Sequence, residues 1–245
     1  MTRRMTGAGR LPRVGGAGRL LKNGRRQPTG RQPIAVVGVG KLTIWSSADP
    51  ADWEALASAE AKTNPRLRAD YGRLDLVPPG RRVGGPGASC LMAPFVHVST
   101  DRPGRFTDGS HGVYSAGNRA EVALREVAHH HGRAMAATDE TPGWTSRFRQ
   151  LIGHIDRELH DLSAVSEVLA PDDHGPGQAL GRALRAAGSD GVHYPSVRCP
   201  GGQCIGVFWP DVPPVPIQGT HCDFHWDGQR VDRVRDRGSG RLFAL

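Results

Sequence analysis

The sequence has few cysteines, no long apolar run and no acidic residue among its first 40 positions. Four cysteines in 245 residues are too few for a disulfide-stabilised scaffold. The longest apolar stretch, residues 34–40, is far shorter than the roughly 18 residues that span a bilayer. These absences exclude a disulfide-rich secreted protein and a membrane protein.

The cysteines allow two interpretations. Cys199 and Cys204 are followed by His221, Cys222 and His225, which together suggest a zinc site. However, the spacing between the first two is wider than usual, and Cys204 opens an apolar run that is typical of a buried strand. Buried, reduced thiols are therefore the favoured interpretation. We expect no metal and a reducing, cytoplasmic location.

The net charge of +8 comes from one end of the chain. Residues 1–40 contain nine Lys or Arg and nine Gly, whereas residues 41–245 contain 23 basic and 24 acidic residues. A segment of this composition cannot bury enough apolar surface to fold, so we expect residues 1–40 to be a disordered basic tail. Such a tail permits nucleic-acid binding as an alternative function. The folded remainder offers no excess positive charge for it.

Residues 41–245 are expected to form a mixed α+β domain with an N-terminal helical extension at about 45–80. Asn118 and Glu121 form a potential capping box at the start of a helix that ends near Gly132. The other expected elements are helices at about 49–62 and 177–187, strands at about 74–78, 90–98, 113–116, 148–155, 159–165, 191–195 and 203–209, and a hairpin at 226–229.

Four residues are candidates for chemistry. Glu126 lies on the inward, apolar side of the 118–130 helix, where a carboxylate is costly unless it has a partner or a function. Tyr114 lies on the preceding strand, and Arg105 precedes a glycine-rich turn. Ser196 lies where a strand leaves the sheet. Taken singly, each can be explained by a structural role.

Their order and context resemble the RES-domain family, which is named for its characteristic Arg, Glu and Ser and comprises toxins of RES–Xre toxin–antitoxin systems. The resemblance runs from about residue 45 to the 226–228 hairpin. Its motifs are Gly104-Arg105-Phe106, Gly112-Val113-Tyr114-Ser115-Ala116, Ala123-Leu124-Arg125-Glu126-Val127-Ala128-His129-His130 and Gly188-Ser189-Asp190-Gly191-Val192-His193-Tyr194-Pro195-Ser196-Val197-Arg198.

The resemblance implies a fold similar to ADP-ribosyltransferase toxins, with a split sheet that cradles NAD. Members of the family cleave the nicotinamide N-glycosidic bond of NAD, with water or phosphate as acceptor. Others pass ADP-ribose to a protein side chain, so a protein mono-ADP-ribosyltransferase is the alternative activity. NAD would then be a substrate, with no cofactor required, which fits the lack of a Gly-x-Gly-x-x-Gly fingerprint in the sequence.

The resemblance assigns catalytic roles to Arg105, Tyr114, Glu126 and Ser196. Glu126 would stabilise the oxocarbenium-like ribose that forms as nicotinamide leaves. Arg105 would hold the diphosphate or ribose, Tyr114 would stack on nicotinamide, and Ser196 would orient the ribose and Glu126. Arg82, or its neighbour Arg81, in the earlier Pro/Gly loop is expected to share the NAD-binding role of Arg105.

Two departures affect the arginine loop, since Phe106 replaces a common Trp and Thr107-Asp108-Gly109 replaces Asn-Pro-Pro-Gly. The partner implied by the resemblance is a cognate antitoxin with an Xre-type helix-turn-helix domain. The protein would contact DNA only through that antitoxin. A homodimer is among the assemblies that the resemblance allows.

Overall fold

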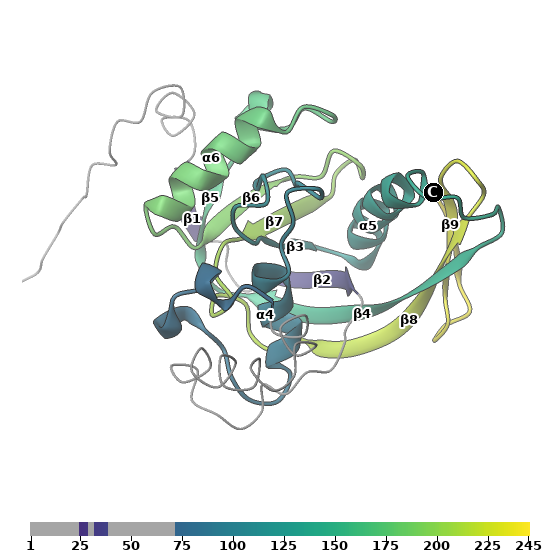
Figure 1. Ribbon diagram of the computed structural model, residues 1–245, viewed down its shortest axis with the longest axis horizontal. Helices are drawn as coiled ribbons and strands as arrows, with labels where there is room; N and C mark the ends of the chain where they lie inside the picture. The colour runs from purple at the N-terminus through teal and green to yellow at the C-terminus, as the bar shows by residue number, and fades with distance from the viewer. Residues whose placement is uncertain (1–24, 29–31, 39–71) are drawn as a thin grey trace, which may run out of the picture.

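The computed structural model describes residues 25–28, 32–38 and 72–245, which form a mixed α+β fold (Figure 1). In this part of the chain ten strands form one sheet in the order β1-β5-β6-β7-β3-β2-β4-β8-β9-β10. The α+β class expected from the sequence is confirmed. The strands are β1 (Arg25–Pro28), β2 (Gln32–Gly38), β3 (Tyr114–Gly117), β4 (Thr145–Ile155), β5 (Glu158–Asp161), β6 (Gly191–Pro195), β7 (Gln203–Val207), β8 (Ile217–Trp226), β9 (Val231–Asp236) and β10 (Leu242–Ala244).

The sheet is divided into two halves that meet at a short contact. β2 pairs with β4 over residues 32–38, but it pairs with β3 only through Ala35 and Gly117. One half therefore contains β1, β5, β6, β7 and β3, and the other contains β2, β4, β8, β9 and β10. All the pairings are antiparallel except that of β5 with β6.

Helix α4 (Ala88–Val96) packs on one face of the first half-sheet. Its buried residues recur at helical spacing and enter a core with Tyr114 and Val207; they are Ala88, Leu91, Met92, Phe95 and Val96. The strand expected at 90–98 is therefore wrong. An apolar run of this length fits either a buried strand or a buried helix, and here the spacing of buried side chains is helical.

Helix α6 (Gly175–Ala186) covers the opposite face. Leu180 and Leu184 enter a core that contains Val192 and Tyr194 of β6. The helix backbone lies directly against the 105–106 segment, because a Cβ on Gly181 would come within 2.1 Å of the Phe106 carbonyl oxygen. The glycines of α6 thus position the segment that carries Arg105.

Helix α5 (Ala120–Met135) packs against β2, β3, β8 and β9. It begins after Arg119 without a side-chain cap, so the capping box expected at Asn118 is wrong. Asn118 Oδ1 instead accepts a hydrogen bond from the backbone N–H of Gln203, at 3.1 Å. The helix also continues through Gly132, where its end was expected.

Three 3₁₀ turns complete the described elements, at Leu74–Leu76, Pro79–Arg81 and Ser166–Val168. The strand expected at 74–78 is therefore a 3₁₀ turn. The helix expected at 49–62 lies outside the described residues. Among the helices that the structure describes, none combines the length and apolar character needed to cross a membrane.

The expectation of a disordered segment over residues 1–40 is wrong for two stretches. β1 pairs with β5, and β2 pairs with β4 along its full length. A strand that joins an existing sheet has its backbone groups satisfied by its neighbours, so its composition alone does not decide whether it folds. The rest of residues 1–40 lies outside the described residues.

Gly181→Ala tests the close contact between α6 and the 105–106 segment. Alanine favours a helix over glycine, but the added methyl group must displace the Phe106 carbonyl. We expect a loss of about 1–3 kcal/mol in the free energy of unfolding. Gly80→Ala is the matched control, because no described atom outside its chain neighbours lies within 4 Å of its added Cβ. Denaturant unfolding that shows equal stability for the two variants would contradict the packing described.

Candidate active site

Glu126 and Ser196 meet where α5 faces the end of β6. Ser196 Oγ lies 2.5 Å from Glu126 Oε1. The Ser196 hydroxyl also accepts hydrogen bonds from the backbone N–H groups of Arg198 and Cys199, at 3.2 and 3.0 Å. Because these donors occupy its lone pairs, the hydroxyl proton is directed to the carboxylate. The short distance is typical of a charge-assisted hydrogen bond.

The loop after β6 holds Ser196 in this orientation. The Ser196 N–H donates to the Gly202 carbonyl, and the Gly202 N–H donates to the Cys199 carbonyl. Gly202 also packs against Val122 of α5, since a Cβ there would approach Val122 Cγ2 to 2.5 Å. The loop is thus closed on itself and pressed against the helix that carries Glu126.

Two further residues of this site were not among the predicted ones. The Cys204 thiol donates to Glu126 Oε1 at 3.7 Å. Tyr194 is paired with Cys204 across β6 and β7 and is buried beside it. Tyr194 lies in β6, two residues before Ser196, which follows the end of that strand. Cys204 could be found only from the strand register.

Burial and the nearby carboxylate control the protonation of these two groups. Burial, followed by the charge of Glu126, raises the pKa of Cys204 to about 12. Burial, Cys204 and Glu126 also raise the pKa of Tyr194 well above its usual value. Both groups therefore stay protonated at neutral pH, and Cys204 can serve as a donor to Glu126.

The second carboxylate oxygen of Glu126 is available to a ligand. Both donors to this carboxylate, Ser196 and Cys204, contact Oε1. Within the part of the chain that the structure describes, no group donates to Oε2. The Glu126 side chain is half-buried, so Oε2 is the oxygen that can face a bound molecule.

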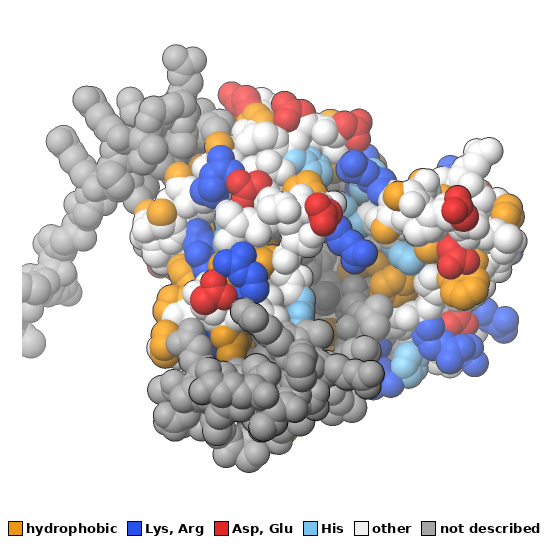
Figure 2. Space-filling view, viewed as in Figure 1, with side chains coloured by type: hydrophobic (Ala, Val, Ile, Leu, Met, Phe, Trp, Pro, Cys, Tyr) orange, Lys and Arg blue, Asp and Glu red, His pale blue; other side chains and the backbone are white. Residues whose placement is uncertain are grey.

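Arg105 lies near this pair, fixed between α6 and the preceding loop. Its Nη1 donates to the carbonyls of Val168 and Ala170, at 2.8 and 2.7 Å. Its positive charge also lowers the pKa values of Tyr194 and Cys204, against the larger effect of burial. Figure 2 shows basic and histidine side chains beside the hollow between the parts that carry α6 and β9.

The structure does not bring Tyr114 to Glu126. Tyr114 is paired with Val207, whereas Cys204 lies three residues earlier on the same strand. Directly paired residues share a face and successive residues alternate, so Tyr114 and Cys204 point to opposite faces of the sheet. Tyr114 is 2% exposed in the core with α4, where burial raises its pKa.

Arg82 and its neighbour Arg81 contact parts of the fold other than the pair of Glu126 and Ser196. Arg82 is 7% exposed and donates to the carbonyls of Val77 and Leu74. Arg81 forms ion pairs with Asp190 and Asp211.

The residues considered for zinc are also separated. Cys199 and Cys204 belong to the core under α6, whereas Cys222 belongs to the core formed by α5, β8 and β9. All four cysteines are free thiols. Within the described residues, no group of three or more His, Cys, Asp or Glu side chains is arranged to hold a metal ion.

Cysteine labelling tests the protonation of Cys204. A pKa of about 12 leaves about one thiolate in 10,000 at pH 8, and each added pH unit raises that fraction about tenfold. We expect iodoacetamide to modify the half-buried Cys90 much faster than Cys204 in the native protein. Mass spectrometry of timed digests measures both rates, with urea-unfolded protein as the control. Equal labelling rates of Cys90 and Cys204 in the native protein would contradict the burial and protonation of the Cys204 thiol.

Comparisons with known proteins agree with the motifs. The family model described as "RES domain" matches residues 79–227. A protein of Sinorhizobium fredii (strain NBRC 101917 / NGR234), named y4oC and described as uncharacterized, is 28% identical over 181 residues, which cover 73% of this chain and 74% of that protein.

A solved structure is also similar, the M. tuberculosis MbcT–MbcA toxin–antitoxin complex. The alignment has a TM-score of 0.45 and 14% identity, and it covers 85% of this chain and 91% of the other.

The matched family segment includes Arg105, Glu126 and Ser196 and begins at the end of the N-terminal extension that the sequence suggested. It spans more than half of the sequence. The chain therefore belongs to the RES domain family.

Proposed function

We propose that the protein cleaves the nicotinamide N-glycosidic bond of NAD and acts as the toxin of a toxin–antitoxin pair. The observation that carries this proposal is the half-buried Glu126 carboxylate, with Oε1 held by Ser196 and Cys204 and with Oε2 available. Membership of the RES domain family supports it. NAD is a substrate in this proposal. The protein acts in the cytoplasm, and its cognate partner is an Xre-type antitoxin.

The proposed reaction depends more on stabilising a cationic transition state than on a general acid that protonates the leaving group. When the bond between ribose C1′ and the pyridinium nitrogen breaks, its electron pair moves to the nitrogen and nicotinamide leaves neutral. The ribose becomes oxocarbenium-like, as a sugar does in glycoside hydrolysis. An oxygen of water or phosphate then bonds to C1′, and the acceptor loses a proton when it is water.

Glu126 is suited to this task because its charge is fixed in position before the reaction. The hydrogen bonds to Oε1 prevent the carboxylate from rotating, so Oε2 does not have to reorganise when the positive charge develops. Arg105 would contact the ribose or the diphosphate through the guanidinium nitrogens that do not bind the loop carbonyls. Tyr114 makes no substrate contact in this proposal, since it lies in the core on the opposite face of the sheet.

Glu126→Gln tests the electrostatic role. The amide keeps the size of the side chain but removes its charge, so we expect nicotinamide release to fall about 100- to 1,000-fold. Glu121→Gln is the matched control on the exposed side of the same helix, where among the described residues the change costs one ion pair, with Arg125. Nicotinamide is quantified by chromatography with purified full-length protein.

Two results would overturn the proposal: wild-type protein that releases no nicotinamide, or a Glu126→Gln variant as active as Glu121→Gln. Three arms of the same assay identify the acceptor of ADP-ribose. Products are compared with and without phosphate, and radiolabel from NAD is followed into protein. Label in a protein band would identify a mono-ADP-ribosyltransferase instead.

Ser196→Ala tests whether the serine orients the carboxylate. It removes the donor to Glu126 and leaves two backbone N–H groups without their acceptor. We expect kcat to fall about 10- to 100-fold with a smaller change in KM. Ser189→Ala is the control, because Ser189 is also buried and its hydroxyl, within the described residues, bonds only to the backbone of Gly191.

Both serine variants should lose some thermal stability, because each removes a buried hydrogen bond. Only Ser196→Ala should lose activity. Equal activity of the two variants at equal folded fraction would show that Ser196 is a structural residue alone.

A further inference from the structure

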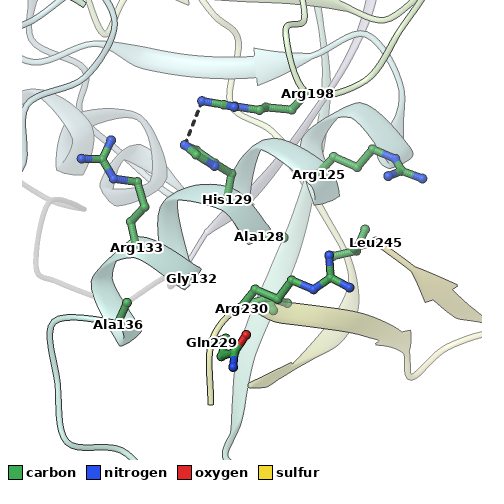
Figure 3. Close-up of a pocket in the computed structure, with 11 residues that line it drawn as sticks. Arg125, Ala128, His129, Gly132, Arg133, Ala136, Arg198, Gln229, Arg230 and Leu245 are labelled. Carbon is green, nitrogen blue, oxygen red and sulfur yellow. Dashed lines mark hydrogen bonds between the residues drawn. The ribbon is translucent and has the colours of Figure 1, made fainter. Parts of the chain in front are cut away.

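A second feature of the molecule is a basic pocket of about 350 Å³ between α5 and β9 (Figure 3). Arg125 and Arg133 reach it from α5, Arg198 from the loop after β6, and Arg230 from the turn before β9. Its floor consists of small or apolar residues, namely Ala128, Gly132, Ala136 and Val231, with Gln229 and Leu245 at the side of the hairpin.

The arginines of this basic pocket are incompletely neutralised. Within the described residues, Arg133 has no ion pair, and the carboxylate of Asp227 lies 3.9 Å from Arg230. Arg198 has an acidic neighbour at 3.6 Å, but that side chain, Asp172, is 88% exposed. Arg125 is paired with Glu121 at 3.3 Å. None of the described residues that line the pocket has an acidic side chain.

One arginine is held in place by neutral acceptors. Arg198 Nη2 lies 3.0 Å from His129 Nε2 and 2.7 Å from the carbonyl oxygen of Pro171. Burial, followed by the charge of Arg198, lowers the pKa of His129 to about 4. His129 is therefore neutral at pH 7 and accepts the hydrogen bond, so it orients Arg198 without neutralising it.

We propose that the basic pocket binds the phosphate groups of a nucleotide. Guanidinium groups present paired donors that match phosphate oxygens. The volume falls in the range of sites for small organic ligands and exceeds what a single ion needs. Ala128, Gly132 and Ala136 follow one another at four-residue spacing, so they give a low surface on which a flat ring can lie. The pocket does not depend on the proposed cleavage of NAD.

Calorimetry with the full-length protein tests this site directly. ADP is titrated at constant ionic strength, with adenosine and inorganic phosphate as separate ligands. We expect ADP to bind more tightly than either, because it alone has both the charge and the ring. Arg133→Ala and Arg230→Ala should each weaken ADP binding about tenfold. Arg73→Ala is the control, since Arg73 is exposed, paired with Asp75 and outside the pocket.

The nucleotide has two sources, and kinetics separates them. If the ligand is the adenosine diphosphate part of NAD, Arg133→Ala raises KM for NAD, leaves kcat unchanged, and has no effect with nicotinamide mononucleotide. If the ligand is a separate nucleotide, KM for NAD is unchanged in the variant. Both results are compatible with the site.

The site is overturned if ADP binds no more tightly than adenosine, or if Arg133→Ala and Arg230→Ala bind ADP as Arg73→Ala does. This result is independent of catalysis, because calorimetry needs no turnover. A protein that binds ADP in this pocket but releases no nicotinamide would refute the proposed function and leave the site standing. A protein that releases nicotinamide but fails the calorimetric test would refute the nucleotide site and leave the proposed function standing.

Discussion

The hydroxyl of Ser196 has one proton to donate, and the loop that carries it determines where that proton goes. Two backbone N–H groups fill the acceptor positions of the oxygen, so the proton points to Glu126. The orientation of the carboxylate therefore depends on a closed turn between β6 and β7 rather than on α5 alone. Cys204 adds a second donor from the neighbouring strand, and burial keeps its thiol protonated. The fold thus fixes one oxygen of Glu126, and no hydrogen-bond donor from the described residues contacts the other.

The arrangement of the sheet explains why this pair lies where it does. The strands on each side of the β2–β3 contact belong to different halves, and α5 packs against strands of both. Glycines allow these close approaches, since a Cβ on Gly117 would meet Val122 at 2.8 Å and one on Gly202 would meet it at 2.5 Å. α6 holds the Arg105 segment on the other side of the site. The three predicted residues that the structure places in one region are thus carried by three different segments.

Sequence patterns predicted the parts of this structure that depend on local spacing. Helix α6, strands β3, β6 and β7, and the inward position of Glu126 all follow from periodicity, and the motifs indicated the family. Patterns failed where a distant partner decides the outcome. The Asn118 side chain bonds to the backbone of Gln203, which cannot be read from the helix start. Likewise, the face on which Tyr114 lies depends on its register with Val207, and β2 owes its place in the sheet to a strand more than 100 residues later.

That last pairing has a consequence for how the chain folds. β2, at residues 32–38, lies inside the sheet between β3 and β4, but its partners in β4 are residues 149–155. During synthesis β2 leaves the ribosome long before its partners in β4 exist. Closing so long a loop costs entropy before the contact between the two strands is gained. The half of the sheet that contains β2 and β4 can therefore be completed only late. We expect refolding to be slow for a domain of this size, with the β2–β4 pairing among the last contacts to form.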